Sequence, residues 1–197
     1  MDINRLEQQL AFIVEIDKLK QIIRQSYITD GTRNETDAEH SWHMAVMAVL
    51  LAEHVDQAEI DVLKVIKMLL IHDVVEIDAG DTYCYDTQGK QTQYQRETEA
   101  ADRLFGLLPA DQEKEFRSLW EEFEATATPE AKFAAALDRL QPLLLQYHTA
   151  GKSWQEHQIV SAKVRERNRH IQQISQVLSQ LVEEIITDSV AKGYLNE

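Results

Sequence analysis

The residues best suited to chemistry lie inside an apolar stretch. Residues 69–81 read LLIHDVVEIDAGD, where His72, Asp73 and Glu76 interrupt a run that is typical of a buried helix. On a helix, His72 and Glu76 lie one turn apart and Asp73 lies a turn before Glu76, so the three side chains face one common side. Burying an unpaired carboxylate costs several kcal/mol. The pattern therefore requires a partner that compensates for the two acids.

Three partners are possible: a hydrogen-bonded pair, a salt bridge or a metal ion. The nearest cations in the sequence, Lys64 and Lys67, lie at least one turn away, toward the start of the helix. Neutral imidazole and carboxylate oxygens are ligands of zinc, manganese, iron and cobalt. The His-Asp pair alone leaves all three alternatives open, and a divalent cation explains the arrangement better than the other two.

Two further segments repeat the anomaly. His40 stands one turn into a helix in ETDAEHSWHMAV, and Asp138 is embedded in AAALDRLQPLLL. Pro142 has no amide hydrogen for the carbonyl four residues earlier, which is that of Asp138, and we expect the helix to bend there.

Together these segments would supply two nitrogens and at least two oxygens from three helices. Such a set leaves positions open for water and substrate, as in a catalytic rather than a closed structural site. The predicted ligands are His40, His72, Asp73 and Asp138. His43 is the rival of His40, and we expect it to lie behind the ligands or in the core.

The elements that carry these residues are predicted to be helices throughout. The chain has only six glycines and three prolines in 197 residues, and apolar residues recur at three- and four-residue spacing. Thr36 with Glu39 matches a capping box, and no segment alternates as a strand. We therefore expect an all-α fold of about six or seven helices, with residues 1–197 as one domain and residues 36–145 as its motif-bearing core. The expected helices are 3–25, 37–55, 60–77, 93–107, 110–125, 129–149 and 154–192.

Outside the helices, the segment 78–92 (DAGDTYCYDTQGKQT) is a long polar loop, which is often a sign of function. The last predicted helix carries apolar residues in steps of three and four, at Ile171, Ile174, Leu178, Leu181 and Ile185. This seam either packs on its own domain, which we favour, or forms a dimer. The charged segment 165–170 (RERNRH) is expected to be a solvated face, with a phosphate contact as the alternative.

Composition excludes some partners. With 34 acidic residues against 20 lysines and arginines, the formal charge is −14, which repels duplex nucleic acid. A small phosphorylated substrate stays possible, because local arginines or a metal act within a screening length of about 8 Å. Cys84 is the one cysteine, and the N-terminal twenty residues carry charges throughout, so we expect no internal disulfide, no signal peptide and no membrane span. These features favour the cytoplasm.

The ordered motifs resemble those of the HD-domain superfamily of metal-dependent phosphohydrolases. AEHS, then HDVVE with DAGDT, ETEAADRLFGLLP and ALDRLQPLL look like the small single-domain members related to bacterial 5′-deoxynucleotidases. The similarity runs from the first helix to about Asn168. It implies an orthogonal helical fold, frequent homodimers and one divalent metal ion (Mn, Co, Zn, Fe, Ni or Mg) on the four residues named above.

The resemblance also implies roles for residues around the metal. Glu76, one turn after the His-Asp pair, and Asp81, in the GD step, would handle protons and position water and substrate. Arginines ahead of the first histidine would contact the phosphate, here Arg33 and Arg24. The implied reaction is hydrolysis of nucleoside 5′-monophosphates by activated water. Hydrolysis of a triphosphate or diester is an alternative, and a non-catalytic metal or nucleotide sensor is another.

The sequence departs from the family pattern at two positions. Gln25 stands where the deoxynucleotidases place a tryptophan beside the sugar, so selectivity for deoxyribose does not carry over. Tyr83 follows GDT where relatives often have proline, which predicts a different loop over the site.

Overall fold

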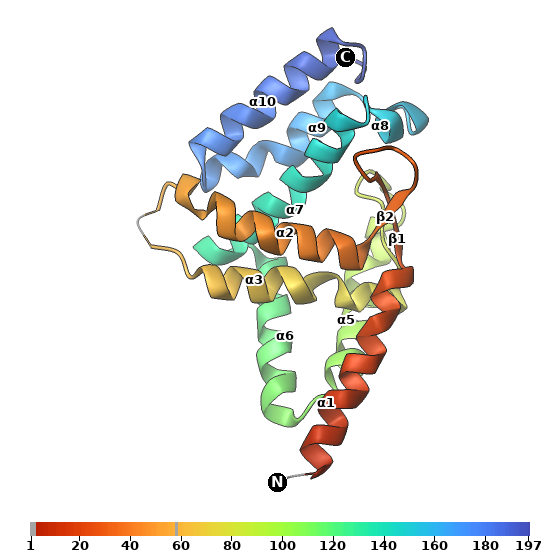
Figure 1. Cartoon of the computed structure of the whole chain (residues 1–197), viewed down its shortest axis with the longest axis vertical. Coiled ribbons are helices and arrows are strands. Elements are labelled where there is room, and N and C mark those ends of the chain that lie inside the picture. The colour runs from red at the N-terminus through yellow and green to blue at the C-terminus, as the bar shows by residue number, and fades with distance from the viewer. Residues whose placement is uncertain (1–2, 58) are drawn as a thin grey trace.

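The structure is a computed structural model that describes residues 3–57 and 59–197. Figure 1 shows α2 and α3 side by side across the middle of the molecule, α5 and α6 below them, and α8 to α10 above, with the two termini at opposite ends. The all-α prediction is confirmed. The elements are α1 (Ile3–Ile16), η1 (Asp17–Gln21), β1 (Ile23–Tyr27), β2 (Asn34–Thr36), α2 (Asp37–Leu51), η2 (Ala52–His54), α3 (Val62–Ile71), η3 (His72–Val75), α4 (Glu76–Ala79), α5 (Lys90–Phe105), α6 (Ala110–Ala125), α7 (Pro129–His148), α8 (Lys152–Glu156), α9 (Ser161–Asn168), η4 (Arg169–Gln173) and α10 (Gln176–Ala191).

Helices α2, α3 and α7 pack on one another, and the candidate ligands come from α2, from α7 and from η3, which follows α3. Their starts follow from the sequence. Thr36 accepts from the amide of Glu39 while the Glu39 side chain accepts from the Thr36 amide, which confirms the capping box. Asp61 caps α3, and Pro129 occupies the first turn of α7. Helix α7 continues through Pro142, and a bend at Asp138 stays a prediction.

The first predicted helix, 3–25, is wrong in its second half. The α-helix ends at Ile16, and β1 pairs antiparallel with β2, in a register that joins Ile23 to Thr36 and Tyr27 to Asn34. Asp30 and Gly31 make the turn: the Asp30 side chain accepts from the Thr32 amide, and Gly31 has a φ of +69°. An Asp-Gly pair is a hairpin signal. The hairpin places Arg24 and Gln25 on a strand beside α2.

The predicted helix 60–77 changes its winding at the His-Asp pair. Helix α3 ends at Ile71, and His72–Val75 forms a 3₁₀ turn before the short α4. The His72 ring donates through Nδ1 to the carbonyl of Leu69, at 3.0 Å. In an unbroken α-helix that carbonyl would accept from the amide of Asp73. Short 3₁₀ segments inside helices often mark functional positions.

The predicted helix 154–192 is also wrong, because it is four segments rather than one. Gln158 adopts a positive φ of 53° between α8 and α9, and Ser175 starts α10 by accepting from the amide of Leu178. The expected seam packs mainly inside its own chain. Ile171, Ile174, Leu178 and Ile185 are buried in the core cluster, which also includes Phe12 and Met44, whereas Leu181 is 37% exposed.

The loop after α4 is shorter than predicted, because α5 begins at Lys90. Gly80 turns the chain with a φ of +74°. Arg96 of α5 then holds the loop by donating to the carbonyl of Ala79 and, at 2.8 Å, to the hydroxyl of Thr82. Within the described residues, no helix combines the length and the apolar character that crossing a membrane requires.

Candidate metal centre

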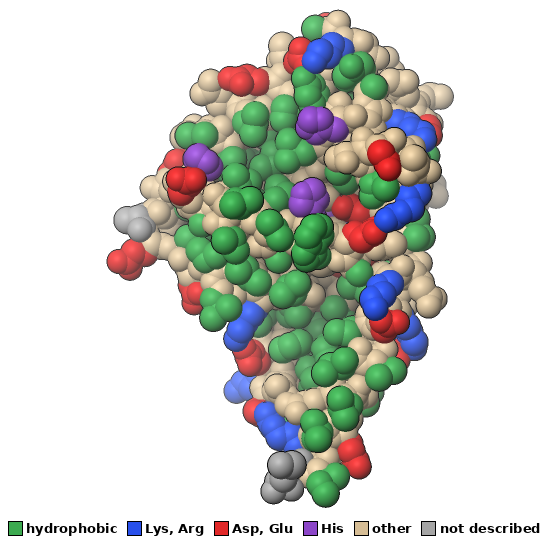
Figure 2. Space-filling view, in the orientation of Figure 1, with side chains coloured by type: hydrophobic (Ala, Val, Ile, Leu, Met, Phe, Trp, Pro, Cys, Tyr) green, Lys and Arg blue, Asp and Glu red, His purple; other side chains and the backbone are tan. Residues whose placement is uncertain are grey.

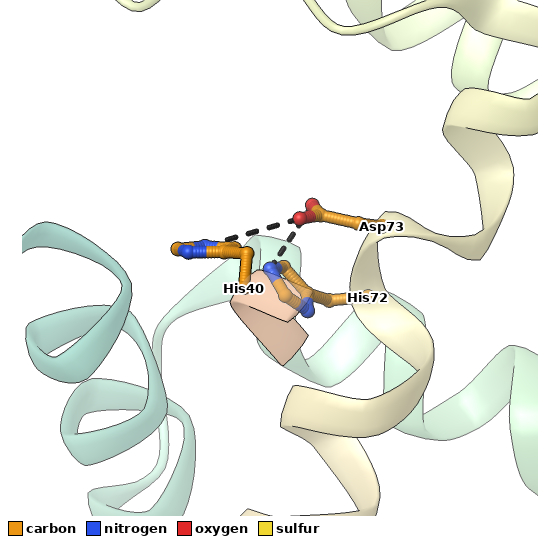
Figure 3. Close-up of side chains that lie close together, drawn as sticks. All are labelled: His40, His72 and Asp73. Atoms are coloured by element: carbon orange, nitrogen blue, oxygen red, sulfur yellow. Dashed lines mark ion pairs between the residues drawn. The ribbon is translucent and has the colours of Figure 1, made fainter. Parts of the chain in front are cut away.

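Three helical elements bring the predicted ligands to one place. His40 comes from α2, His72 and Asp73 come from η3, and Asp138 comes from α7. Figure 3 shows the two imidazoles and the Asp73 carboxylate directed toward one another. His40 is fully buried, His72 and Asp73 are nearly so, and the side chain of Asp138 is 20% exposed. The four residues therefore form a buried cluster that is open at Asp138.

Hydrogen bonds at the far side of each ring fix the histidine tautomers. Nδ1 of His72 donates to the Leu69 carbonyl. Nδ1 of His40 lies 2.9 Å from Oε1 of Gln141, whose Nε2 donates to Oε1 of Glu35 at 2.6 Å, so the Gln141 oxygen must accept from His40. When Nδ1 of a neutral imidazole is the donor, Nε2 carries a lone pair. In their neutral form, which is the form that binds a metal, both histidines therefore turn an Nε2 lone pair toward the carboxylates.

The distances between these lone pairs and the carboxylates are short. Nε2 of His72 lies 3.0 Å from Oδ1 of Asp73 and 4.0 Å from Oδ1 of Asp138. Nε2 of His40 lies 3.2 Å from Oδ1 of Asp138 and 3.9 Å from Oδ2 of Asp73.

The imidazole lone pairs and the carboxylate oxygens are all hydrogen-bond acceptors, so they repel one another unless a cation lies between them. Nε2 of His72 is buried without a hydrogen-bond partner. One ligand atom each from His40, His72 and Asp73 lies within 4.8 Å of the others, and mixed nitrogen and oxygen donors suit a divalent transition metal. The residues present therefore fit one divalent cation.

The charges of the cluster agree with this reading. Burial and Arg24 lower the pKa of His40, but the carboxylates of Asp138, Glu35 and Asp73 outweigh them and raise it to about 9. Burial raises the pKa of Asp73, but His72 and Arg24 outweigh it, and that pKa falls to about 2. The negative charge that attracts protons to the histidines would equally attract a metal, so protons and metal compete here.

A second cluster adjoins the first through Asp73. Nη1 of Arg24 lies 2.9 Å from Oδ1 of Asp37 and 2.9 Å from Oδ2 of Asp73, and Nε of Arg24 lies 3.9 Å from Oε2 of Glu35. Burial raises the pKa of Glu76 well above its usual range, and Asp73 and Asp37 raise it further. Glu76 and Asp37 therefore both bind a proton more readily than free carboxyls do, and burial is the main cause that raises the pKa of Asp37 to about 6.

A cavity of about 210 Å³ opens beside both clusters. Asp81 lines this cavity, and burial raises its pKa, as expected for a carboxyl close to the acidic ligands. Arg24, Gln25 and Tyr83 also line it. Gln25 accepts through Oε1 from Nε2 of His157, at 3.2 Å.

The structure does not bring Arg33 to this cavity. Its guanidinium makes a two-fold ion pair with Glu39, at 2.5 and 2.8 Å, and its side chain is 52% exposed. His43 lies behind the ligands, with Nδ1 3.1 Å from Nε2 of Gln141. The structure thus brings Arg24 to the cavity and leaves Arg33 outside it, although the sequence analysis expected both arginines at the site.

Sequence reasoning missed two site residues. Gln141 orients His40, and its signal was available, because it is another polar residue within the apolar ALDRLQPLLL. Arg167 lines the cavity with Nη2 3.6 Å from Oδ2 of Asp138. The segment 165–170 was predicted to be a solvated face, which is wrong for Arg167, and no local pattern separates this arginine from its neighbours.

Comparison with known proteins agrees with the geometry. Residues 16–179 match the family model described as HD domain. The chain is 33% identical over 136 residues to human 5′-deoxynucleotidase HDDC2, covering 68% of this chain and 65% of the relative. The chain is 31% identical over 182 residues to the Xenopus laevis protein of the same name, covering 82% of this chain and 89% of that relative. The chain thus spans about two thirds of the length of the human relative.

One solved structure is similar over nearly the whole chain. A predicted metal-dependent phosphohydrolase from Magnetospirillum magnetotacticum MS-1 superposes with a TM-score of 0.94 at 49% identity, covering 98% of this chain and 97% of that one. A protein from Pyrococcus horikoshii, PH0347, shares the fold at 22% identity and a TM-score of 0.64.

Proposed function

The chain belongs to the HD domain family, and from this premise we propose that it is a metal-dependent phosphohydrolase that cleaves nucleoside 5′-monophosphates. One observation carries the proposal. Two buried Nε2 lone pairs and two ionised carboxylates converge beside a cavity that also presents an arginine and a carboxyl of raised pKa. This arrangement has a place for a cation, for a phosphate and for a proton. The names of the relatives support the nucleotide as substrate.

Each group has a role in the proposed reaction. A bound divalent cation supplies Lewis acidity, which lowers the pKa of water and neutralises phosphate charge. His40, His72, Asp73 and Asp138 would hold that cation. Arg24 stabilises negative charge on the phosphoryl oxygens, as preorganised cations do in phosphoryl transfer.

Protons are handled by the carboxyls. Asp81 faces the cavity, and its raised pKa brings it closer to neutrality, where a group both accepts and donates a proton efficiently. Burial, Asp73 and Asp37 raise the pKa of Glu76 well above its usual range, so Glu76 is the second carboxyl that we assign to proton handling. The Asp81→Asn variant should lose turnover and keep its metal, whereas turnover equal to that of the parent would remove Asp81 from the reaction.

The proposal is tested by phosphate release from protein stripped of metal and reloaded with cobalt, manganese or zinc. Deoxy- and ribonucleoside monophosphates, triphosphates and a phosphodiester are compared. We expect release from monophosphates that is lost in the Asp73→Ala and Asp138→Ala variants. Turnover of triphosphates or diesters alone would replace the proposed substrate, and metal binding without any turnover would favour a sensor. The ratio of ribo- to deoxyribonucleotide turnover shows whether Gln25 admits both sugars.

We also propose that residues 1–197 act as one HD-type domain, in the cytoplasm, and as a homodimer. Figure 2 shows hydrophobic side chains gathered over α2 and α3. The exposed apolar residues of these helices are Trp42, Val46, Val49, Leu50, Leu63 and Leu70. Apolar patches of this kind often mark interfaces, and a second copy is the occupant that the family resemblance implies. Light scattering should give twice the chain mass for the parent and the chain mass for Val49→Glu. A monomeric parent would contradict the proposal.

A further inference from the structure

Arg167 differs from the two arginines that flank it in sequence. It lies in the last turn of α9, between Arg165, which pairs with Glu183 at 3.0 Å, and Arg169, which pairs with Glu166 at 2.8 Å. The side chains of Arg165 and Arg169 are 42% and 57% exposed, whereas that of Arg167 is 25% exposed and lines the cavity. The segment thus turns one of its three guanidiniums inward.

The inward guanidinium completes a symmetrical pattern around the candidate ligands. Oδ1 of Asp73 faces Nε2 of His72, and Oδ2 of Asp73 faces Arg24, at 3.0 and 2.9 Å. Oδ1 of Asp138 faces Nε2 of His40, and Oδ2 of Asp138 faces Arg167, at 3.2 and 3.6 Å. Each carboxylate therefore has one oxygen toward a histidine and the other toward an arginine, so the two arginines flank the cluster.

Arg24 and Arg167 differ in the number of carboxylates with which they form ion pairs. Arg24 has the carboxylates of Asp37, Asp73 and Glu35 within 4 Å. Among the described residues, Arg167 makes one ion pair, to Asp138, and its 3.6 Å is longer than a hydrogen bond. A guanidinium carries five N–H donors and stays charged at all ordinary pH values. Those of Arg167 therefore remain available in the cavity.

A half-buried, weakly paired guanidinium that lines a cavity in a chain of net charge −14 calls for an anion. Within the described part of the chain, Asp138 is the one carboxylate in an ion pair with Arg167; burial lowers the pKa of Arg167, while Cys84, Asp138 and Tyr85 raise it. The fork of a guanidinium matches the oxygens of a phosphoryl group. Arg167 also lies on the Asp138 side of the candidate metal, where Arg24 does not reach.

We propose that Arg167 binds the phosphoryl group of the substrate, from the Asp138 side of the site, while Arg24 acts from the Asp73 side. This inference rests on the proposed function and deepens it. It assigns a substrate contact to the C-terminal segment, which contributes none of the four candidate ligands.

The test measures binding of inorganic phosphate by titration calorimetry to cobalt-loaded protein, together with the cobalt content of each sample. The variants are Arg167→Gln, Arg167→Lys and the matched control Arg165→Gln, from the exposed face of the same helix. We expect the phosphate Kd to rise about 10- to 100-fold in Arg167→Gln, less in Arg167→Lys, and less than about twofold in the control. Cobalt content should stay at the parent level in all three.

Several outcomes would overturn the inference. They are a parent that binds no phosphate, an unchanged Kd in Arg167→Gln, and loss of cobalt in parallel with phosphate, which would make Arg167 a positioning residue for Asp138. If Arg167→Gln fails to fold, an unchanged Kd in Arg167→Lys decides against the inference and a raised one supports it. Failure of the proposed function looks different, because the parent would then bind phosphate through Arg167 and hydrolyse no monophosphate.

Discussion

Two charged clusters share the Asp73 carboxylate, and they present groups of opposite character to its two sides. On one side, His40, His72 and Asp138 meet Asp73 with lone pairs and negative charge. On the other side, Arg24 supplies a positive charge to Asp73 and Asp37 at 2.9 Å. The first cluster includes no lysine or arginine, whereas the second includes Arg24. Acidic residues that lie close together therefore do not by themselves define a metal site. Whether a metal binds depends on whether histidines or an arginine surround them.

The nature of the surrounding groups matters because, in both clusters, the ligand atoms lie close enough together to bind one metal ion. Ligand atoms of Asp37, Asp73 and Glu76 lie within 4.8 Å of one another, as do those of His40, His72 and Asp73. In the acidic trio, the guanidinium of Arg24 already compensates for part of the charge, through its contacts to Asp37 and Asp73. One metal per chain, on the histidine side, is the expectation that the following predictions test.

The largest difference is expected between Asp138→Asn and Asp37→Asn. Asp138→Asn removes a charged ligand oxygen and should lower both cobalt content and turnover, the latter by about 10³-fold or more. Asp37→Asn should keep one cobalt per chain, because Asp37 contacts Arg24 rather than a histidine. Elemental analysis and phosphate release measure the two effects. A parent with two ions that falls to one in Asp37→Asn would erase the distinction between the clusters.

The next effect concerns stability, in Arg24→Gln compared with Arg33→Gln. Loss of Arg24 leaves buried carboxylates without their cation, which costs about 3–5 kcal/mol. Arg33 and Glu39 are exposed, so solvent screens that pair and its loss should cost much less than the loss of Arg24. Urea unfolding of the metal-free proteins at pH 7 gives both values. Equal destabilisation by the two substitutions would show that Arg24 is not the cation on which the second cluster depends.

A smaller effect is expected when the support of His40 is removed. Gln141→Met keeps the length of the side chain but loses the acceptor for Nδ1 of His40, so the tautomer is no longer fixed. Groups of this kind typically contribute about 10- to 100-fold to metal affinity. Competition with a chromophoric chelator measures the cobalt Kd. Parent-like affinity in Gln141→Met would mean that His40 is not oriented through Gln141, or is not a ligand.

The smallest effect is a pH dependence at the exposed pair. Arg33 is the main cause that lowers the pKa of Glu39 to about 2, and the Thr36 amide lowers it further against the effect of burial. A carboxyl with a lowered folded pKa stabilises the protein above its unfolded pKa of about 4.5 and loses that contribution as pH falls toward 2. Glu39→Gln keeps the capping box, so it should cost less than about 1 kcal/mol at pH 7. Urea unfolding at pH 3 should show a smaller cost than at pH 7, and a larger cost would contradict the assignment.

The sequence predicts that His40, His72, Asp73 and Asp138 meet in the folded chain, for a physical reason. His40, His72, Asp73 and Asp138 each interrupt an apolar helix, and a buried polar group without a partner is costly. Such an interruption can be recognised from the sequence alone. The raised pKa of Glu76 cannot be predicted in this way, because it depends on burial and on Asp37, which comes close to Glu76 only in the folded chain.

The arginines and the C-terminal helix show where local pattern fails. Arg33 and Arg167 both stand in polar segments, yet the first pairs with Glu39 at the surface and the second faces the cavity. Similarly, the periodicity of residues 154–192 gives no sign of the break before Ser175. That residue starts α10 and also donates through its hydroxyl to the carbonyl of His54, at 2.6 Å. Both features depend on contacts between distant parts of the sequence.

The most direct test of the central claim is anomalous diffraction at the cobalt edge from crystals of the cobalt-loaded protein. We expect one peak per chain, located among Nε2 of His40, Nε2 of His72 and carboxylate oxygens of Asp73 and Asp138. A peak between Asp37 and Glu76 instead, or no peak at either cluster in protein that releases phosphate, would contradict this expectation.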